Sequence, residues 1–505
     1  MRRPGVLVLV AVVAACTTSG TPVDLPPPDA TVTTPTSATT KALVGAPGAS
    51  GIGDRLYPEL GNGGYDVDRY HFEIEVGADW SVVATARVEL TPLGDLSAFN
   101  LDLAGLDVQS VEVDGFEAAG FEHRDRELTI DLGGTARAGV PISVTVLYSG
   151  TPRSVPADAV PFRPGWQQGE EVAYLFSQPD GAQSLFPVND HPLDRADVDL
   201  VVTTPTGVEA ISGGAIVSES QAGSGDTVVW EMIDIAPYLI PLAIGQFTVV
   251  SDRVVDGVQY DVWVSDDLVE STAIETFDIQ PDVIAFFEER FGPYPFDRAG
   301  ALIVDDDLGA ALETQTIPTY TATSARWGEI VIAHELAHQW FGDSITLEQW
   351  DDIWLNEGFA TFAHWLWLEE RFGRDRYDSE VEVAYRLLSG IGLTESGVTP
   401  AVAADRVRAA FPPPDDPRAA DLFNRSVYDR GGLALVALRD SVGDTALFDL
   451  IRTYTQRFRG SSITTEAFLA LVDEALGAEP AALLAAWVGD VEIPPLPDRG
   501  LIPPG

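Results

Sequence analysis

Residues 334–338 read HELAH, and Glu357 follows after 18 intervening residues in the stretch NEGFA, residues 356–360. If residues 334–338 are helical, His334 and His338 lie one turn apart on one face, with Glu335 beside them. Both imidazoles can then reach a single ion, and Glu357 adds an oxygen ligand from a second element. Two histidines and one glutamate leave one position of a zinc ion open for water or a substrate carbonyl. The pattern therefore predicts a catalytic Zn²⁺ site, one per chain, with His334, His338 and Glu357 as its ligands.

Two histidines at helical spacing are also compatible with packed core residues, and a bare HExxH pattern occurs by chance. The apolar run Ile330 to Ala333 precedes the motif, so the helix is expected to be buried. Two imidazoles and a carboxylate on a buried face are costly without a partner, and a metal ion satisfies all three. This context favours the zinc interpretation.

The composition limits the classes of protein to which the chain can belong. Its 505 residues suffice for two or more domains, and 45% hydrophobic with 21% charged residues is typical of a soluble globular protein. The formal net charge of −48 argues against nucleic-acid binding, because a phosphate backbone would be repelled. Dispersed acidic residues mostly keep a surface hydrated, although a negative surface also attracts the amino terminus of a peptide.

The N-terminus is typical of an exported protein. Arg2 and Arg3 precede an apolar run from Val6 to Ala15, which is too short to span a bilayer and fits a signal peptide over residues 1–15. Cys16 is the single cysteine, so no intramolecular disulfide can form. Residues 13–16, VAAC, resemble a bacterial lipobox, which implies lipidation of Cys16 and anchoring to the outer face of a bacterial cell membrane. The alternative is an ordinary signal peptide beside a cysteine, which would give a secreted protein.

The remaining chain divides by composition. Residues 16–52 are rich in Thr, Pro, Ser, Ala and Gly and are expected to form a disordered tether. Residues 53–252 contain short alternating runs, such as Phe72 to Val76 and Val198 to Val202, which indicate a mostly antiparallel β domain. Residues 253–495 begin with one more predicted strand and continue with helical patterns, such as Ile279 to Phe291 and Leu433 to Val442. Residues 496–505 form a Pro-rich tail.

Several motifs resemble those of the M1 zinc aminopeptidases over about residues 60–495. Residues 334–343 read HELAHQWFGD and residues 350–360 read WDDIWLNEGFA, and both match the family nearly throughout. Residues 291–296, FGPYPF, resemble the family's lead-in to its catalytic domain, and residues 177–192 resemble its glutamine-containing loop. The resemblance implies an α+β multidomain fold, in which an N-terminal antiparallel β-sandwich or saddle-like domain precedes a thermolysin-like, mainly helical zinc-peptidase domain. Many family members continue with a large helical domain; its lack here implies a more open cavity that accepts longer peptides.

The resemblance also implies a set of substrate-binding residues. Residues 310–314, AALET, match the family's Gly-Ala-Met-Glu-Asn strand, so Glu313 is expected to bind the free amine of a peptide, together with Gln178. A carboxylate there would hold an ammonium group through charge-assisted hydrogen bonds. Ala310 and Ala311 would lie along the substrate backbone. Three of the five positions differ from the family, so the preferred N-terminal residue stays open.

Tyr428 resembles the family's tyrosine before a Lys-Gly pair, with Arg430 in place of the lysine. A phenol aimed at the scissile carbonyl oxygen would stabilise the negative charge that develops during the reaction.

These features predict a zinc-dependent aminopeptidase that removes N-terminal residues from peptides by attack of metal-activated water. Glu335 would be the general base, and Tyr428 would assist at the oxyanion. A thermolysin-type endopeptidase uses the same ligand set, and a non-catalytic peptide-binding lipoprotein would have the same fold. An intact ligand set disfavours the second alternative, and Glu313 disfavours the first. The oligomeric state is not predicted.

Overall fold

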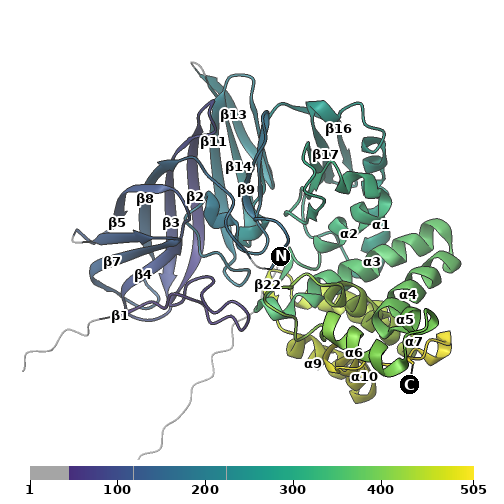
Figure 1. The fold of residues 1–505 in the computed structure, drawn as a ribbon. Coiled ribbons are helices and arrows are strands. Elements are labelled where there is room, and N and C mark those ends of the chain that lie inside the picture. Colours follow the sequence, from purple (N-terminus) through teal and green to yellow (C-terminus); the bar gives the residue numbers. More distant parts are fainter. Residues whose placement is uncertain (1–44, 118, 158, 223–224, 505) are drawn as a thin grey trace, which may run out of the picture. The chain divides into compact units, whose positions relative to one another are not determined.

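The computed structural model describes residues 45–504 except 118, 158 and 223–224 (Figure 1). The predicted signal peptide, Cys16 and most of the predicted tether lie outside the described residues. Among the described residues, no helix is both long and apolar enough to cross a membrane.

The first half of the described chain is built of β-strands. Alternation of apolar and polar residues explains them: in β2 (Tyr65–Val76) buried and solvent-facing side chains mostly alternate, because successive side chains of a strand point to opposite faces. In the described residues, a seven-stranded sheet has the order β13 (Ala215–Ala222), β14 (Gly225–Ile235), β11 (Ala196–Pro205), β2, β3 (Val82–Pro92), β8 (Ile142–Gly150) and β5 (Asp107–Val113). Its pairs are antiparallel except β11 with β2, as the sequence largely predicts.

Two four-stranded sheets of described residues complete this half. One has the order β1 (Ala46–Pro47), β4 (Leu96–Asp102), β7 (Glu127–Ala136) and β6 (Gly120–Arg124). The other has the order β12 (Glu209–Ser212), β15 (Leu242–Gly245), β10 (Val172–Phe176) and β9 (Gly165–Gln168). Strand β1 falls inside the predicted tether and corrects its C-terminal limit at residue 52. The backbone there has specific partners, since the Ala46 amide donates to the Asp95 carbonyl and the Gly48 amide to the Ala98 carbonyl.

The second half combines a mixed sheet with helices (Figure 1). The sheet has the order β16 (Phe247–Val255), β17 (Val258–Ser265), β18 (Arg298–Val304), β20 (Thr319–Thr321) and β19 (Ala311–Leu312). Because β16 pairs with β17, this sheet begins before the predicted domain boundary at residue 252. A short pair joins β21 (Ile345–Leu347) to β22 (Ser461–Ile463). The helices are α1 (Gln280–Phe291), α2 (Glu329–His338), α3 (Trp354–Phe372), α4 (Arg374–Ser389), α5 (Ile391–Glu395), α6 (Pro400–Ala410), α7 (Gly431–Val442), α8 (Asp444–Arg457), α9 (Thr465–Leu476) and α10 (Ala478–Gly489).

The predicted order of a β-rich region followed by a mainly helical region is confirmed. The predicted Pro-rich tail packs on the helices: Leu496 and Leu501 pair with each other, and the Arg499 guanidinium forms ion pairs with Asp378 and Asp440.

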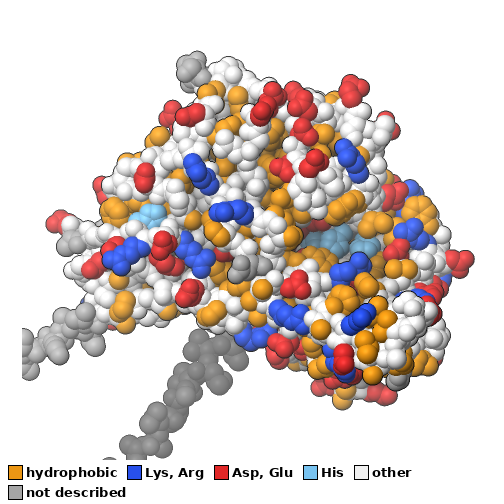
Figure 2. All heavy atoms as spheres, viewed as in Figure 1, with side chains coloured by type: hydrophobic (Ala, Val, Ile, Leu, Met, Phe, Trp, Pro, Cys, Tyr) orange, Lys and Arg blue, Asp and Glu red, His pale blue; other side chains and the backbone are white. Residues whose placement is uncertain are grey.

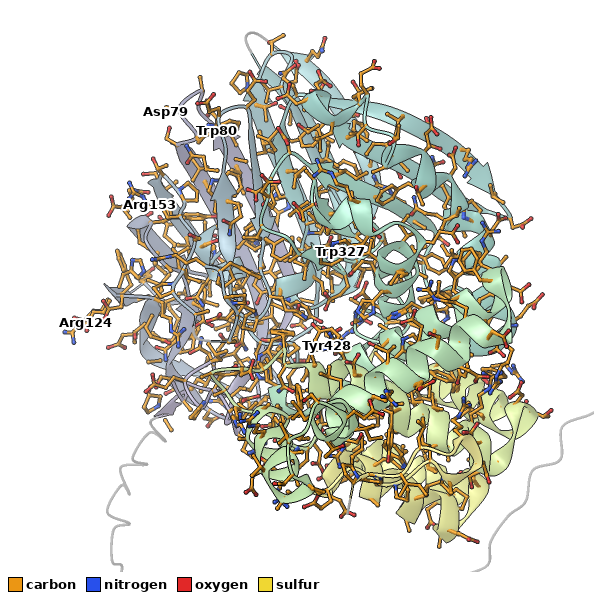
Figure 3. All side chains as sticks on the ribbon, turned by 45° about the vertical axis from the view of Figure 1, so that its right-hand side comes forward. Asp79, Trp80, Arg124, Arg153, Trp327 and Tyr428 are labelled. Carbon is orange, nitrogen blue, oxygen red and sulfur yellow. The ribbon has the colours of Figure 1, made fainter. Side chains whose placement is uncertain are left out.

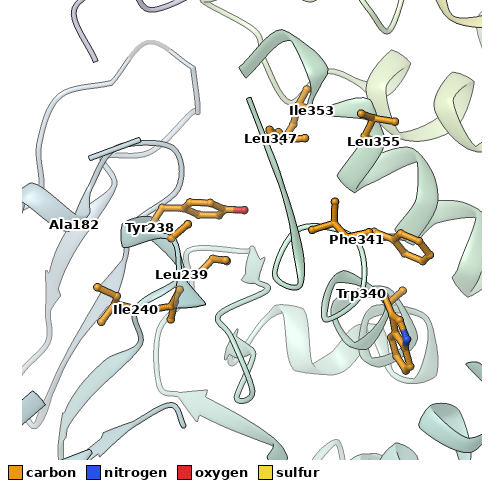
Figure 4. Packing of buried hydrophobic residues seen from close by; sticks show 14 of the residues in the cluster. Ala182, Tyr238, Leu239, Ile240, Trp340, Phe341, Leu347, Ile353 and Leu355 are labelled. Carbon is orange, nitrogen blue, oxygen red and sulfur yellow. The ribbon is translucent and has the colours of Figure 1, made fainter. Parts of the chain in front are cut away.

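One hydrophobic cluster runs through both halves. Tyr238, in the 3₁₀ turn η2 (Pro237–Leu239) of the β-rich region, packs in the same cluster as Phe341 and Ile353, which flank the two motif helices (Figure 4). The rings of Tyr238 and Trp350 have centroids 5.5 Å apart. The strands and the helices therefore share a core, and burial of the motif segments depends on both.

Several carboxyl groups of the β-rich region are buried. Asp102, Asp190 and Asp194 are almost completely inaccessible, and Asp180 is buried beside Arg126. Burial raises the pKa of Asp102 to about 7, that of Asp180 to about 6 and that of Asp194 to about 8. These carboxyl groups hold protons in the folded protein at pH values where an unfolded chain has released them.

The protein is therefore expected to lose stability between about pH 4 and pH 8. The raised pKa values add stability that is complete below the unfolded value near 4 and is lost as the pH rises through the folded values. Thermal unfolding followed by circular dichroism should give a melting temperature several degrees higher at pH 5 than at pH 8. Asp102→Asn should flatten this slope, whereas the exposed control Asp79→Asn should not; an equal slope in wild type and Asp102→Asn would contradict the explanation.

Candidate metal centre and active site

Three predicted ligands converge on one point. Helix α2 carries His334 and His338, and helix α3 carries Glu357 in its first turn. The Nε2 atoms of His334 and His338 lie 3.2 Å and 3.3 Å from the same oxygen, Glu357 Oε2. The two ring centroids are 4.8 Å apart. One helical turn and a second helix thus bring two nitrogens and one oxygen to a single location.

The donor set fits a zinc ion. Nitrogen and oxygen ligands about 2.1 Å from a tetrahedral zinc lie roughly 3.4 Å from each other, close to the observed separations. The His338 Nδ1 atom is 3.0 Å from the Phe341 carbonyl oxygen, which can only accept, so Nδ1 carries the hydrogen. In a neutral ring the Nε2 lone pair then faces a carboxylate oxygen. A cation between them removes the repulsion.

The charges of this cluster are strongly coupled. Burial pushes the pKa of Glu357 upward, but the charge of His338 and hydrogen bonds from both rings outweigh it and lower the pKa to about 2. Burial pushes the pKa of His338 downward, yet the neighbouring Glu357 carboxylate raises it well above its usual value. Burial lowers the pKa of His334. Glu357 is thus an anion, and positive charge on the side of the two rings stabilises it.

Glu335 lies beside the three ligands. It is buried, and Glu313, Glu335 and His338 each offer an atom within 4.8 Å of the others. Burial raises the pKa of Glu335 well above its usual value. A carboxyl group with a raised pKa is suited to accept and return a proton near neutral pH.

Glu313 and Gln178 come together from opposite halves of the chain. Glu313 follows the edge strand β19, and the Gln178 side-chain amide donates a 2.7 Å hydrogen bond to Glu313 Oε1. The Gln339 amide donates to the Glu313 carbonyl oxygen at 3.3 Å. Burial raises the pKa of Glu313 to about 7. The carboxylate is fixed in position, and its side-chain hydrogen-bond donor, the Gln178 amide, is neutral, so an ammonium group of a substrate would add a charged donor.

Thr314 and Leu312 explain two departures from the family's strand motif. The Thr314 hydroxyl donates to the Ile317 carbonyl at 2.7 Å, and Leu312 is buried in the hydrophobic core, so both serve the strand itself. Arg430, where the family has lysine, donates to the carbonyl oxygens of Trp487 and Asp490 and holds the end of α10.

Tyr428 approaches Glu357 because two glycine-containing segments touch. Its hydroxyl donates to Glu357 Oε1 at 3.1 Å from a π-helical turn, η7 (Ser426–Arg430), a local geometry frequent at functional sites. A Cβ atom on Gly358 would lie only 2.8 Å from the Gly431 Cα atom. Any side chain at residue 358 would push α3 away from the turn that carries Tyr428.

These residues line one cavity of about 530 Å³. Ala310 and Ala311 lie on its wall, as do exposed Trp327 from η5 (Ser324–Trp327) and Tyr428 from η7, both labelled in Figure 3. Histidine side chains are visible from outside among hydrophobic and uncharged atoms in Figure 2. A larger cavity of about 960 Å³ includes Gln315 and Thr316 but none of the predicted site residues, so the chemistry belongs to the smaller one.

Sequence analysis missed His364. Its Nδ1 atom lies 3.2 Å from His334 Nδ1, and the ring lines the catalytic cavity. Burial lowers the pKa of His364 well below its usual value. A signal was available, because residue 364 follows Glu357 by two helical turns and shares its face.

Comparison with known proteins agrees with this geometry. The sequence matches the Peptidase family M1 domain over residues 275–487. A crystal structure of a two-domain M1 zinc metallopeptidase bound to L-tryptophan is 30% identical and superposes with a TM-score of 0.76, covering 88% of this chain and 99% of that one. The chain belongs to the M1 family of zinc metallopeptidases.

Other M1 proteins are similar over shorter stretches. Aminopeptidase M1-A of Oryza sativa is 27% identical over 63% of this chain and 37% of its own length. Probable aminopeptidase 1 of Sulfurisphaera tokodaii is 27% identical over 62% of this chain and 40% of its own. This chain thus spans little more than a third of such relatives. An M1 zinc metallopeptidase from Deinococcus radiodurans is 29% identical, with a TM-score of 0.76 and coverage of 88% and 99% of the two chains. These structural relatives are zinc metallopeptidases, and zinc is accordingly the cofactor of the family.

Proposed function

We propose that this M1 protein is an aminopeptidase that hydrolyses the first peptide bond of substrates with a free N-terminus. The observation that carries the proposal is the buried Glu313 carboxylate, fixed by Gln178 beside the three converging ligands. A carboxylate next to a hydrolytic centre can bind the ammonium group of a substrate whose N-terminus lies close to the scissile bond. The substrate of an endopeptidase has no ammonium group near its scissile bond, so the Glu313 carboxylate would have no partner there.

His334, His338 and Glu357 are assigned as the ligands of one zinc ion. When bound, zinc supplies a Lewis acid that polarises the scissile carbonyl and lowers the pKa of a water molecule toward neutrality. The ligands come from two helices that share a core, so they are held in place before substrate arrives.

Glu335 takes the proton from the attacking water and passes it to the leaving amine. Its burial and its place one residue after His334 keep its carboxyl group beside the residues that would hold the zinc ion. Tyr428 donates its hydroxyl hydrogen to the carbonyl oxygen as negative charge develops there. Because this hydroxyl bonds to Glu357 in the described structure, it is already directed toward the ligands.

The substrate amine and backbone are held by the strand that leads to Glu313. Strand β19 (Ala311–Leu312) is at the edge of its sheet, so an extended peptide could lie along its open side, whereas the Ala310 carbonyl already accepts from Thr321. The related M1 metallopeptidase from Deinococcus radiodurans has been crystallised with a Tyr-Ser-Ala substrate, and that precedent supports short peptides as substrates here.

Glu335→Gln should keep zinc and lose turnover. We expect kcat to fall by about 10² to 10⁴, because the proton acceptor is removed while no ligand changes. Zinc content measured by mass spectrometry should stay near one per chain, whereas the matched variant Glu357→Gln should lose zinc as well. A Glu335→Gln enzyme with the wild-type rate on a fluorogenic aminoacyl substrate would refute the assignment.

Blocking the substrate amine should separate the aminopeptidase from the endopeptidase. Acetylation removes the ammonium charge, so kcat/KM for a short peptide should fall by roughly 10- to 100-fold or more. Glu313→Gln should lower kcat/KM for the free peptide and leave the acetylated peptide unaffected. Equal cleavage of both peptides by the wild-type enzyme would favour a thermolysin-type endopeptidase.

We further propose that Cys16 carries the lipid anchor of an exported protein. The VAAC sequence at residues 13–16 and the apolar run before it support this placement. In a bacterial host, Cys16→Ala should move the protein from the membrane fraction to the medium or periplasm, measured by fractionation and immunoblot. Unchanged membrane retention would argue for another means of attachment.

A further inference from the structure

The two imidazole ligands differ in what holds their second nitrogen. His338 Nδ1 lies 3.0 Å from the Phe341 carbonyl oxygen. His334 Nδ1 lies 3.2 Å from another imidazole nitrogen, His364 Nδ1, with ring centroids 5.4 Å apart and planes at 49°. A ligating histidine generally donates its second ring N–H to an acceptor, which fixes the orientation of the ring. An imidazole can fill that role only through a nitrogen that carries no hydrogen.

We propose that His364 is a positioning residue for zinc: it accepts the Nδ1–H hydrogen bond of His334 through its own Nδ1, as the tautomer with hydrogen on Nε2. The Nε2 lone pair of His334 is thereby directed at the ion. This inference rests on the ligand assignment made above. His364 touches neither the ion nor the reacting carbonyl in this arrangement, and it acts through His334.

The position of residue 364 suits this role. Helix α3 carries both Glu357 and His364, two turns apart on the same face, so one helix supplies a ligand and the support of another ligand. Placing Glu357 against α2 therefore places His364 against His334. The support of His334 therefore forms as α2 and α3 pack, whereas the Phe341 carbonyl that supports His338 lies in the turn after α2.

The charge of the surroundings explains why a neutral ring is suited to this position. Glu313, Glu335 and Glu357 already bring three carboxylates close to His338. A carboxylate at position 364 would add to this repulsion, whereas an imidazole accepts the hydrogen bond without adding charge. Arg376 also acts electrostatically on His364 and disfavours its cationic form.

The Ala360 carbonyl is a competing acceptor. It interacts with both His334 and His364 and favours the protonated form of each. If it alone held His334, the side chain at position 364 would merely line the cavity. The two arrangements differ in how zinc affinity responds to substitution of His364.

The test is the zinc dissociation constant of the full-length enzyme, measured by competition with a chromophoric chelator. His364→Ala should weaken zinc binding about 10- to 100-fold, the usual cost of losing such a support. His364→Gln should recover most of this loss, because its carbonyl oxygen can accept the same hydrogen bond. The control His123→Ala removes a histidine of the β-rich region, whose Nε2 lies 2.7 Å from the Leu103 carbonyl oxygen, and should leave zinc affinity unchanged.

Two results would overturn the proposal. Wild-type zinc affinity in His364→Ala would assign the support to the Ala360 carbonyl. Equal weakening in His364→Ala and His364→Gln, accompanied by a lowered melting temperature in both, would assign residue 364 a packing role. Zinc affinity is measured without substrate, so either failure is distinguishable from failure of the proposed peptidase activity, which Glu335→Gln and the acetylated peptide address.

Discussion

The structure of the site depends on one carboxylate oxygen, Glu357 Oε2, held between the Nε2 atoms of two histidines. This arrangement requires α2 and α3 to pack closely, and it requires a cation where three electron-rich atoms face each other. Gly358 extends the constraint to a third element, because its missing side chain allows the turn at Gly431 to approach. Tyr428 thereby reaches Glu357, so the proposed oxyanion donor is placed by the proposed metal ligand.

The acidic residues of this cavity would be balanced by two positive groups, a zinc ion at Glu357 and the ammonium group of a substrate at Glu313. Glu357 is compensated by zinc and the imidazoles, whereas Glu313 has a pKa raised to about 7 and has the Gln178 amide, a neutral donor, as its side-chain partner. A neutral donor orients the carboxylate without cancelling its charge, so an arriving ammonium group replaces the proton that burial would otherwise favour. In the proposed function, substrate binding at Glu313 and zinc binding at Glu357 would therefore each neutralise a different carboxylate of the same cavity.

Features formed by residues close together in the sequence could be predicted, whereas contacts between distant residues mostly could not. The histidines and Glu335 follow from helical periodicity, because residues one turn apart must share a face. The strand at Phe72 to Val76 and the helix at Ile279 to Phe291 follow from local patterns, and both occur. Gln178 and Glu313 are 135 residues apart and follow strands of different sheets, so only the family resemblance connected them. No pattern indicated that the backbone of residues 46–48 would pair with β4, because that pairing depends on a surface formed by other strands.

Asp54 connects the β-rich region to the segment that carries Glu357. Its carboxylate accepts hydrogen bonds from the backbone amides of Tyr57 and Trp350 and contacts His191 at 3.2 Å. One buried side chain thus joins the segment at residues 54–57, the glutamine-containing loop and the turn that begins the Glu357 helix. Because Gln178 lies on the same loop as His191, displacement of this loop would disturb both the amine site and the start of α3. The β-rich region consequently helps to set the distance between the proposed zinc ligands and Glu313, the proposed amine-binding carboxylate.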